Sequence, residues 1–150
     1  MSSALNDYPP EYLKKKREEF GQKYEEKLII IKKNGCHIWN GAVNGRSFDD
    51  GRSRYGVVNL THPVTKKRTC FNAHVFSLFL HNGMLPDRTL KIDISHLCHE
   101  TLCVNPQHLN QEPHEVNVKR RLCVSKKTCS THAPYPDCLY IKKVSKLVNK

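Results

Sequence analysis

The middle of the chain carries two cysteines and a histidine at five-residue intervals, Cys98, Cys103 and His108. Thiolate and imidazole side chains are the ligands of tetrahedral zinc, and a closed structural site needs four of them. Cys36, in a predicted turn, is the first choice for the fourth ligand, and His99 is the weaker one because it adjoins Cys98. The competing interpretation is a chance cluster, with Cys36 as a small core residue.

A second set of metal-binding side chains follows within sixteen residues: Cys123, Cys129, His132 and Cys138. This is a complete Cys3His set, typical of a structural zinc site. The Ser, Thr, Pro and Lys residues between the ligands cannot form a packed core, so metal binding would have to supply the folding free energy. The alternative is four such residues without a metal. Cys70 is left over and is predicted to be a buried strand residue.

Two further residues could do chemistry, because neither zinc set needs them. His96 precedes Cys98, and a neutral histidine can deprotonate water near pH 7. Asn117 follows 21 residues later with an amide oxygen, a hard and uncharged ligand for Mg²⁺. Together they could support metal-assisted phosphodiester hydrolysis. On composition alone, the ordinary interpretation is favoured, because a lone histidine usually only forms hydrogen bonds and a lone asparagine on a helix is usually solvated. His114 is interpreted as a polar neighbour of Asn117 rather than a ligand.

Composition and charge favour a nucleic-acid partner. Apolar residues make up 38% of the 150 residues, below the roughly 45–50% of ordinary domains. We therefore expect a small hydrophobic core whose stability depends in part on bound metal ions. The formal net charge is +11, and residues 119–150 hold nine Lys/Arg and one acid. Such a density of positive charge is typical of polyanion binding, although a merely soluble basic tail would look the same.

The cysteine count and the hydropathy indicate a reducing compartment. Seven cysteines cannot all pair in intramolecular disulfides. The segment Met1–Asp7 has no apolar stretch of the kind a signal peptide needs, and the aliphatic run Leu28–Ile31 is too short to span a bilayer. We therefore expect an intracellular protein, in the nucleus by preference, whose cysteines bind metal.

The N-terminal segment, residues 1–35, is predicted to be a charged helix over Pro9–Lys33. Apolar residues recur along it at helical spacing, Pro10 suits the first turn, and Asn34-Gly35 would end the helix. Gly21 leaves two shorter helices as an alternative.

The next segment has strand character broken by turn signals. Arg54–Leu60 and Lys67–Phe71 are predicted to pair as an antiparallel hairpin across the turn at Pro63. A basic strand ribbon of this kind suits a DNA groove, while a solvated face is the alternative. The candidate nucleic-acid-binding residues are Arg52, Arg54, Lys66, Lys67 and Arg68.

The elements that must position His96 and Asn117 come after this hairpin. A short buried helix is predicted at Ala73–Leu80, and a strand at Leu90–Ile94 that ends beside His96. A return strand at His108–Gln111 and a helix from Pro113 to about Leu122 follow the metal loop, with only loops beyond Cys123. The predicted fold is a small, zinc-stabilised α+β domain in which strand, metal loop and strand pack on the helix that carries Asn117.

The order Ser95-His96-Leu97-Cys98-His99-x-Thr101-x-Cys103-x-Asn105-Pro106-x-His108-Leu109, with Asn117 downstream, closely resembles the His-Cys box homing endonucleases. These belong to the ββα-metal, or His-Me finger, nuclease superfamily. The likeness extends over roughly Cys36–Cys138 and is most specific from Ser95 to Asn117. Tyr55-Gly56 and Ala73-His74 also look like the segments that precede the box in related HNH enzymes.

The resemblance implies a Mg²⁺-dependent DNA endonuclease of the site-specific homing type, with a homodimer as the candidate assembly. It implies that His96 is the general base and that Asn117 holds one catalytic Mg²⁺. Arg54 is the first choice, and Arg68 the second, for an arginine on the scissile phosphate. The two cysteine–histidine sets would each hold a structural zinc. Residues 36–138 would form the nuclease domain, with residues 139–150 as a basic tail.

Two other functions remain open from the sequence. The same zinc ligands and basic residues would serve a zinc-folded DNA-binding module without catalysis, which would have no need of both His96 and Asn117. A nuclease of low specificity, acting on DNA or RNA, is the other alternative.

Overall fold

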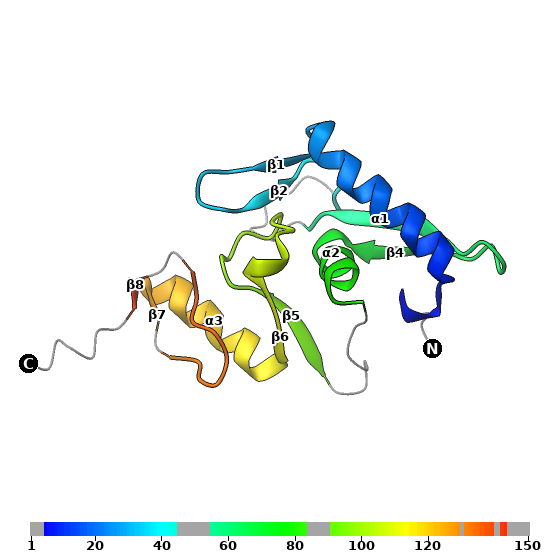
Figure 1. The fold of residues 1–150 in the computed structure, drawn as a ribbon. Helices are drawn as coiled ribbons and strands as arrows, with labels where there is room; N and C mark the ends of the chain where they lie inside the picture. The colour runs from blue at the N-terminus through cyan, green and yellow to red at the C-terminus, as the bar shows by residue number, and fades with distance from the viewer. Residues whose placement is uncertain (1–4, 45–54, 84–90, 130, 140–141, 144–150) are drawn as a thin grey trace, which may run out of the picture. The chain divides into compact units, whose positions relative to one another are not determined.

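The computed structural model describes residues 5–44, 55–83, 91–129, 131–139 and 142–143. The chain divides into two compact units, residues 1–85 with 101–106 and residues 86–100 with 107–150. Within the described residues, each strand pairs with one partner, and three of the four two-stranded sheets are antiparallel. With three α-helices in the described residues, the fold is a small α+β arrangement, as predicted (Figure 1).

In the first unit a short 3-10 helix, η1, at Leu5–Asp7 is followed by helix α1, Pro10–Glu25. The helix runs through Gly21 without a break and buries Phe20. The predicted extension of this helix to Lys33 is wrong. Ile29–Ile31 forms strand β1, which pairs with β2, His37–Trp39, because a run of β-branched residues favours extended backbone. Asn34-Gly35 is the hairpin turn, with Gly35 at φ 94°.

The predicted basic hairpin is confirmed. Strand β3, Val57–Thr61, pairs antiparallel with β4, Arg68–Asn72, in a register that sets Val57 opposite Asn72. Lys66, Lys67 and Arg68 are exposed at its turn and on the following strand, whereas Arg52 and Arg54 lie outside the described residues. The prediction for Cys70 is wrong, because this residue of β4 is exposed.

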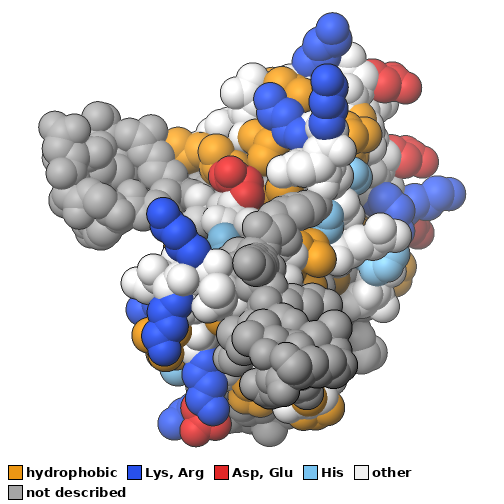
Figure 2. Space-filling view, turned by 90° about the vertical axis from the view of Figure 1, so that its left-hand side faces the viewer, with side chains coloured by type: hydrophobic (Ala, Val, Ile, Leu, Met, Phe, Trp, Pro, Cys, Tyr) orange, Lys and Arg blue, Asp and Glu red, His pale blue; other side chains and the backbone are white. Residues whose placement is uncertain are grey.

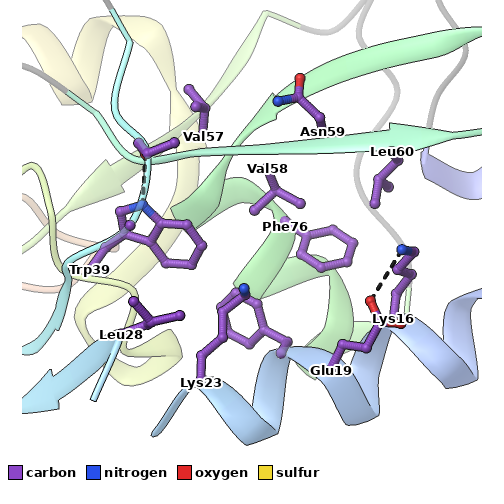
Figure 3. Close-up of a pocket in the computed structure, with 13 residues that line it drawn as sticks. Lys16, Glu19, Lys23, Leu28, Trp39, Val57, Val58, Asn59, Leu60 and Phe76 are labelled. Atoms are coloured by element: carbon purple, nitrogen blue, oxygen red, sulfur yellow. Dashed lines mark hydrogen bonds and ion pairs between the residues drawn. The ribbon is translucent and has the colours of Figure 1, made fainter. Parts of the chain in front are cut away.

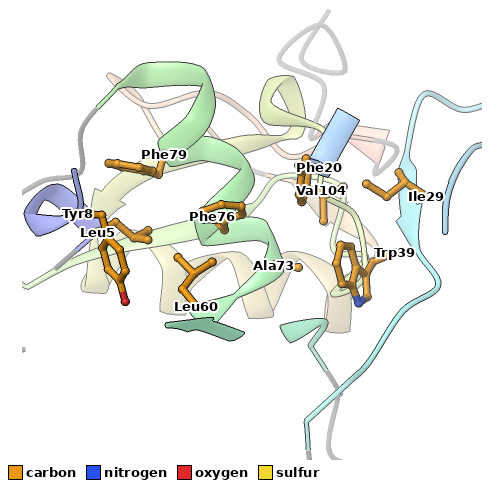
Figure 4. Close-up of a cluster of buried hydrophobic side chains, with 10 residues drawn as sticks. All are labelled: Leu5, Tyr8, Phe20, Ile29, Trp39, Leu60, Ala73, Phe76, Phe79 and Val104. Atoms are coloured by element: carbon orange, nitrogen blue, oxygen red, sulfur yellow. The ribbon is translucent and has the colours of Figure 1, made fainter. Parts of the chain in front are cut away.

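The core of the first unit is a cluster of aromatic and aliphatic side chains gathered around helix α2, Ala73–Asn82 (Figure 4). The α2 prediction is confirmed, and the helix ends at Gly83 in the left-handed conformation. Phe20 lies between two other rings, stacked on Trp39 at 6.0 Å and edge-on to Phe76 at 5.7 Å. Trp39 also fills the space above Gly56, where any Cβ would collide with the indole ring.

A pocket of about 330 Å³ opens beside this core (Figure 3). Trp39 and Phe76 line it together with residues of α1 and β3, and Lys16 and Glu19 form an ion pair at 3.1 Å on its wall. None of the residues predicted to do chemistry lines this pocket.

The second unit contains the strand pair and helix predicted to hold the chemistry. Strand β5, Ile92–His96, pairs antiparallel with β6, Leu109–Pro113, after a short 3-10 helix, η3, at Pro106–His108. Helix α3, His114–Lys126, lies beside both strands (Figure 1). It is longer than predicted, and Cys123 lies on it rather than in a loop. Two short parallel strands follow, β7 at Thr128–Cys129 and β8 at Lys142–Lys143.

Candidate metal centres and active site

The second cluster, Cys123, Cys129, His132 and Cys138, is brought together as predicted. Each residue offers one ligand atom, all four atoms lie within 4.8 Å of one another, and all four residues are buried. His132 Nε2 is 3.4 Å from Cys123 Sγ and 3.6 Å from Cys138 Sγ. The Cys138 backbone N–H donates to Cys129 Sγ at 3.3 Å, an interaction that favours a thiolate. This donor set fits a structural zinc site.

The protonation of these ligands depends on burial. Burial lowers the pKa of His132, with the positive charge of Arg120 acting in the same direction, so its imidazole is neutral and can bind a metal near pH 7. Burial and the neighbouring cysteines raise the pKa of Cys138 to about 12, against a hydrogen bond from Arg120. A buried thiol of that kind loses its proton readily only when a cation such as Zn²⁺ binds the sulfur in its place.

A buried ion pair lies behind the second cluster. Arg120 of α3 donates to Glu112 of β6 at 2.6 Å and 2.7 Å, and both residues are only 1% exposed. The same guanidinium reaches Cys138 Sγ at 3.6 Å and the Pro136 carbonyl oxygen at 2.8 Å. Ser95 of β5 also donates to Glu112, at 2.5 Å. This network therefore joins β5, β6 and α3 to the loop of the second cluster.

The pKa values of this pair follow from its hydrogen bonds. Burial by itself would raise the pKa of Glu112, but the hydrogen bonds from Arg120, Ser95 and Asn110 outweigh it and hold the pKa below its usual value. Burial likewise opposes the charge on Arg120, but Glu112 raises the pKa of Arg120 above its usual value. The pair is therefore ionised.

The first cluster consists of Cys36, Cys98, Cys103 and His108, whose ligand atoms also lie within 4.8 Å of one another. Cys36, rather than His99, is the fourth member, as the sequence predicted. Backbone pairing sets two of the ligands: Cys36 ends the β1–β2 turn, and Cys103 forms an antiparallel bridge with Ile38 of β2. The donor set again fits a structural zinc site.

Backbone hydrogen bonds join the segments that carry these ligands. The Cys36 N–H donates to Asn34 Oδ1 at 2.9 Å, and the Val104 N–H donates to the His37 carbonyl oxygen at 2.8 Å. At the other two ligands, the Leu97 N–H donates to the His108 carbonyl oxygen at 2.8 Å.

The predicted catalytic residues lie on the elements expected for them. His96 is the last residue of β5, opposite Leu109 of β6, and is half-buried. Asn117 is half-buried in the first turns of α3, on the same face as Arg120 and Cys123. The facing of His96 and Asn117 stays a prediction, because the hydrogen bond of the Asn117 side chain goes to Asp93, three residues before His96 on β5.

Asp93 is a residue that the sequence analysis missed. Its Oδ2 accepts from Asn117 Nδ2 at 2.9 Å and from His114 Nδ1 at 2.7 Å. Its position in the sequence could have identified it, because Asp93 lies two residues before Ser95 and therefore on the same face of the strand. His114 and Asn117 share this carboxylate, and the interpretation of His114 as a polar neighbour rather than a ligand stays a prediction.

The family model that matches the chain is the zinc-binding loop region of homing endonuclease, over residues 42–140. That span covers about two thirds of the chain and includes every residue of both clusters except Cys36. The chain belongs to this family. No curated protein and no solved structure matches it. Membership of a homing endonuclease family suggests a nuclease or DNA-binding role.

This homing endonuclease family member carries a formal net charge of +11. Lys and Arg side chains lie across the face drawn in Figure 2, and several acidic side chains lie among them. The exposed lysines and arginine of the β3–β4 hairpin add to this charge. In the described residues, no helix is long and apolar enough to cross a membrane.

Proposed function

We propose that this protein is a Mg²⁺-dependent endonuclease that hydrolyses phosphodiester bonds in duplex DNA, with His96 as general base and Asn117 as metal ligand. One observation carries the proposal: the match to the homing endonuclease zinc-binding loop spans the β5–β6–α3 segment on which both residues lie. An antiparallel strand pair beside a helix, in a chain that also holds two Cys3His clusters, is a rigid support for such a site.

The chemistry proposed for His96 is proton transfer. The neutral imidazole takes a proton from a water molecule while the water oxygen attacks phosphorus, and the bond from phosphorus to the 3′ oxygen breaks. The leaving 3′ oxygen takes a proton from solvent water, so the products are a 5′-phosphate and a 3′-hydroxyl. A divalent cation, when bound, stabilises the charge that develops on the phosphate and on the leaving oxygen. Asn117 would hold that cation through its amide oxygen.

The remaining roles in the proposal belong to binding and support. The exposed Lys66, Lys67 and Arg68 of the hairpin would contact the DNA, as would Arg52. Arg54 is the first candidate for a contact with the scissile phosphate. The two zinc-type clusters would be structural, since all four ligand positions of each are filled by protein side chains and no open position remains for substrate.

The test is cleavage of supercoiled plasmid by purified, zinc-loaded protein, with and without added Mg²⁺ and without a chelator. Wild type should nick and linearise the plasmid only with Mg²⁺. His96→Ala should slow cleavage by about 10²–10⁴-fold, the usual contribution of a general base. His81→Ala, at an exposed histidine of α2, is the matched control and should cleave as wild type does.

The outcome also separates the alternatives. Discrete bands would indicate the site-specific homing type, and many fragments a nuclease of low specificity. Wild type that binds DNA and leaves it uncut with Mg²⁺ would contradict the proposal and favour a DNA-binding module. Equal cleavage by wild type and His96→Ala would remove His96 from the mechanism.

A further inference from the structure

The carboxylate of Asp93 is shared between two side chains of helix α3. Its Oδ2 accepts from Asn117 Nδ2 at 2.9 Å and from His114 Nδ1 at 2.7 Å. His114 and Asn117 are three residues apart, so they lie on the same face of the helix. Asp93 therefore connects β5, the strand that ends in His96, with the helix that carries Asn117.

This contact fixes which end of the Asn117 amide points away from β5. An ionised carboxylate can only accept hydrogen bonds, so the group beside it must be the NH₂ of the amide. The carbonyl oxygen, Oδ1, is consequently turned away from Asp93. Only that oxygen can bind a hard cation such as Mg²⁺, because the amide nitrogen has no available lone pair.

Exposure distinguishes Asp93 from the other carboxylate of this strand pair. Glu112 is fully enclosed, and three side chains donate to it. The Asp93 side chain keeps 30% of its surface exposed, and that of His114 keeps 60%. Glu112 therefore has the environment of a structural ion pair, whereas Asp93 lies where solvent and substrate could reach its surroundings.

We propose that Asp93 is a positioning residue for the divalent cation, which it serves by holding the Asn117 carboxamide through its nitrogen. The inference rests on the proposed function, because it takes Asn117 as the metal ligand. Removing a residue that is hydrogen-bonded to a metal ligand typically lowers metal affinity by about 10–100-fold. The negative charge of Asp93 near the site also favours a cation.

Two variants separate the hydrogen bond from the charge. Asp93→Ala removes both. Asp93→Asn removes the charge and keeps a carbonyl oxygen that can accept from Asn117 Nδ2. His114→Gln is the control on the same helix face, because it removes the competing imidazole and leaves the Asp93–Asn117 hydrogen bond in place.

The first measurement needs no cleavage. Mn²⁺ added to zinc-loaded, ¹⁵N-labelled protein should broaden the side-chain NH₂ signals of Asn117 in wild type. Asp93→Ala should shift those signals in the metal-free spectrum and raise the Mn²⁺ concentration for half broadening by about tenfold or more. Asp93→Asn should recover most of that loss, and His114→Gln should stay within about threefold of wild type.

Cleavage gives the second measurement. Asp93→Ala should raise the Mg²⁺ concentration for half-maximal cleavage by a similar factor, with the rate at saturating Mg²⁺ within a few-fold of wild type. A fall in rate at every Mg²⁺ concentration, with unchanged Mn²⁺ broadening, would contradict the positioning role. Equal melting temperatures and zinc contents exclude misfolding, and Asp93→Asn provides the comparison if Asp93→Ala does not fold.

The two proposals fail in different ways. If wild type binds Mn²⁺ beside Asn117 in an Asp93-dependent manner but cuts no DNA, the nuclease proposal fails and the positioning role stands. If wild type cuts DNA and Asp93→Ala shows wild-type signals and affinity, the positioning role fails alone. Absence of any Mn²⁺ effect on Asn117 in wild type would overturn the positioning role.

Discussion

The two compact units of this chain bury different kinds of side chain. In the first unit the buried cluster is apolar and mostly aromatic, and it includes Phe20, Trp39 and Phe76. In the second unit the corresponding cluster consists of three cysteines, Cys123, Cys129 and Cys138. The first unit can therefore be stabilised by removing hydrocarbon from water, and the second has little hydrocarbon to remove.

Helix α3 shows how this difference arises. Its buried residues are Arg120 and Cys123, and Asn117 on the same face is half-buried, while Leu122 and Val124 are exposed. An ordinary surface helix buries an apolar stripe instead. The buried face of α3 thus carries a cysteine of the second cluster, one partner of an ion pair and the proposed catalytic ligand. Cysteine ligands suited to zinc and a charged pair occupy the place of an apolar stripe there.

The largest effect on the folding of the second unit should come from removing one ligand of the second cluster. Cys129→Ser should unfold α3 and the loop that follows it, because zinc binding of this type supplies on the order of 10 kcal/mol of folding free energy. Hydrogen exchange should show lost protection in α3. Trp39, the chain's single tryptophan, reports on the first unit, and its fluorescence should stay near that of wild type.

The control for this variant is Cys70→Ser, because Cys70 is an exposed cysteine outside both clusters. It should leave the protection of α3 unchanged. Full protection of α3 in zinc-depleted Cys129→Ser protein would show that an apolar or ionic core suffices for the second unit.

The buried ion pair should have the next largest effect. Glu112→Gln leaves Arg120 buried without a carboxylate, which should cost about 3–5 kcal/mol of unfolding free energy in urea titrations near pH 7. Replacing both residues together, as in Glu112→Leu with Arg120→Met, should recover much of that loss. If the double variant is no more stable than Glu112→Gln, the two residues contribute more to the unfolding free energy than the neutralisation of each other's buried charge.

The pKa of Glu112 gives this effect a pH dependence. Because the folded-state pKa lies below the unfolded value, the stabilisation is complete above about pH 4.5 and is lost as pH falls through the folded pKa. The difference in unfolding free energy between wild type and Glu112→Gln should therefore shrink below about pH 4.5. A difference that stays constant down to pH 3 would contradict the assigned direction of the pKa.

The smallest effects concern the packing of the first unit. Gly56→Ala would place a methyl group against the Trp39 ring and should cost about 1–3 kcal/mol, with a shift in tryptophan fluorescence. Gly21→Ala is the matched substitution, since nothing lies within 4 Å of the added methyl group on α1. It should stabilise the protein by about 0.5–1 kcal/mol, as a helix-interior alanine usually does. Similar costs at both positions would mean that Trp39 is not tightly packed.

The sequence predicted best what depends on spacing. Both ligand sets, including Cys36, and the β3–β4 hairpin followed from residue types and intervals along the chain. It predicted poorly what depends on tertiary competition. Leu28 and Ile31 continue a helical stripe by period, yet Ile29–Ile31 pair with His37–Trp39 because a turn at Gly35 brings that strand alongside. Asp93 had no motif, since its role appears only when β5 and α3 are adjacent.

The number of zinc ions bound per chain shows whether metal stabilises the second unit in place of an apolar core. Native mass spectrometry of wild type expressed with zinc should find two zinc ions per chain, and Cys129→Ser should retain one. The second unit should lose its amide protection in step with the loss of that ion. Wild-type protein that is fully folded with one zinc ion or none would contradict the view that metal replaces an apolar core in the second unit.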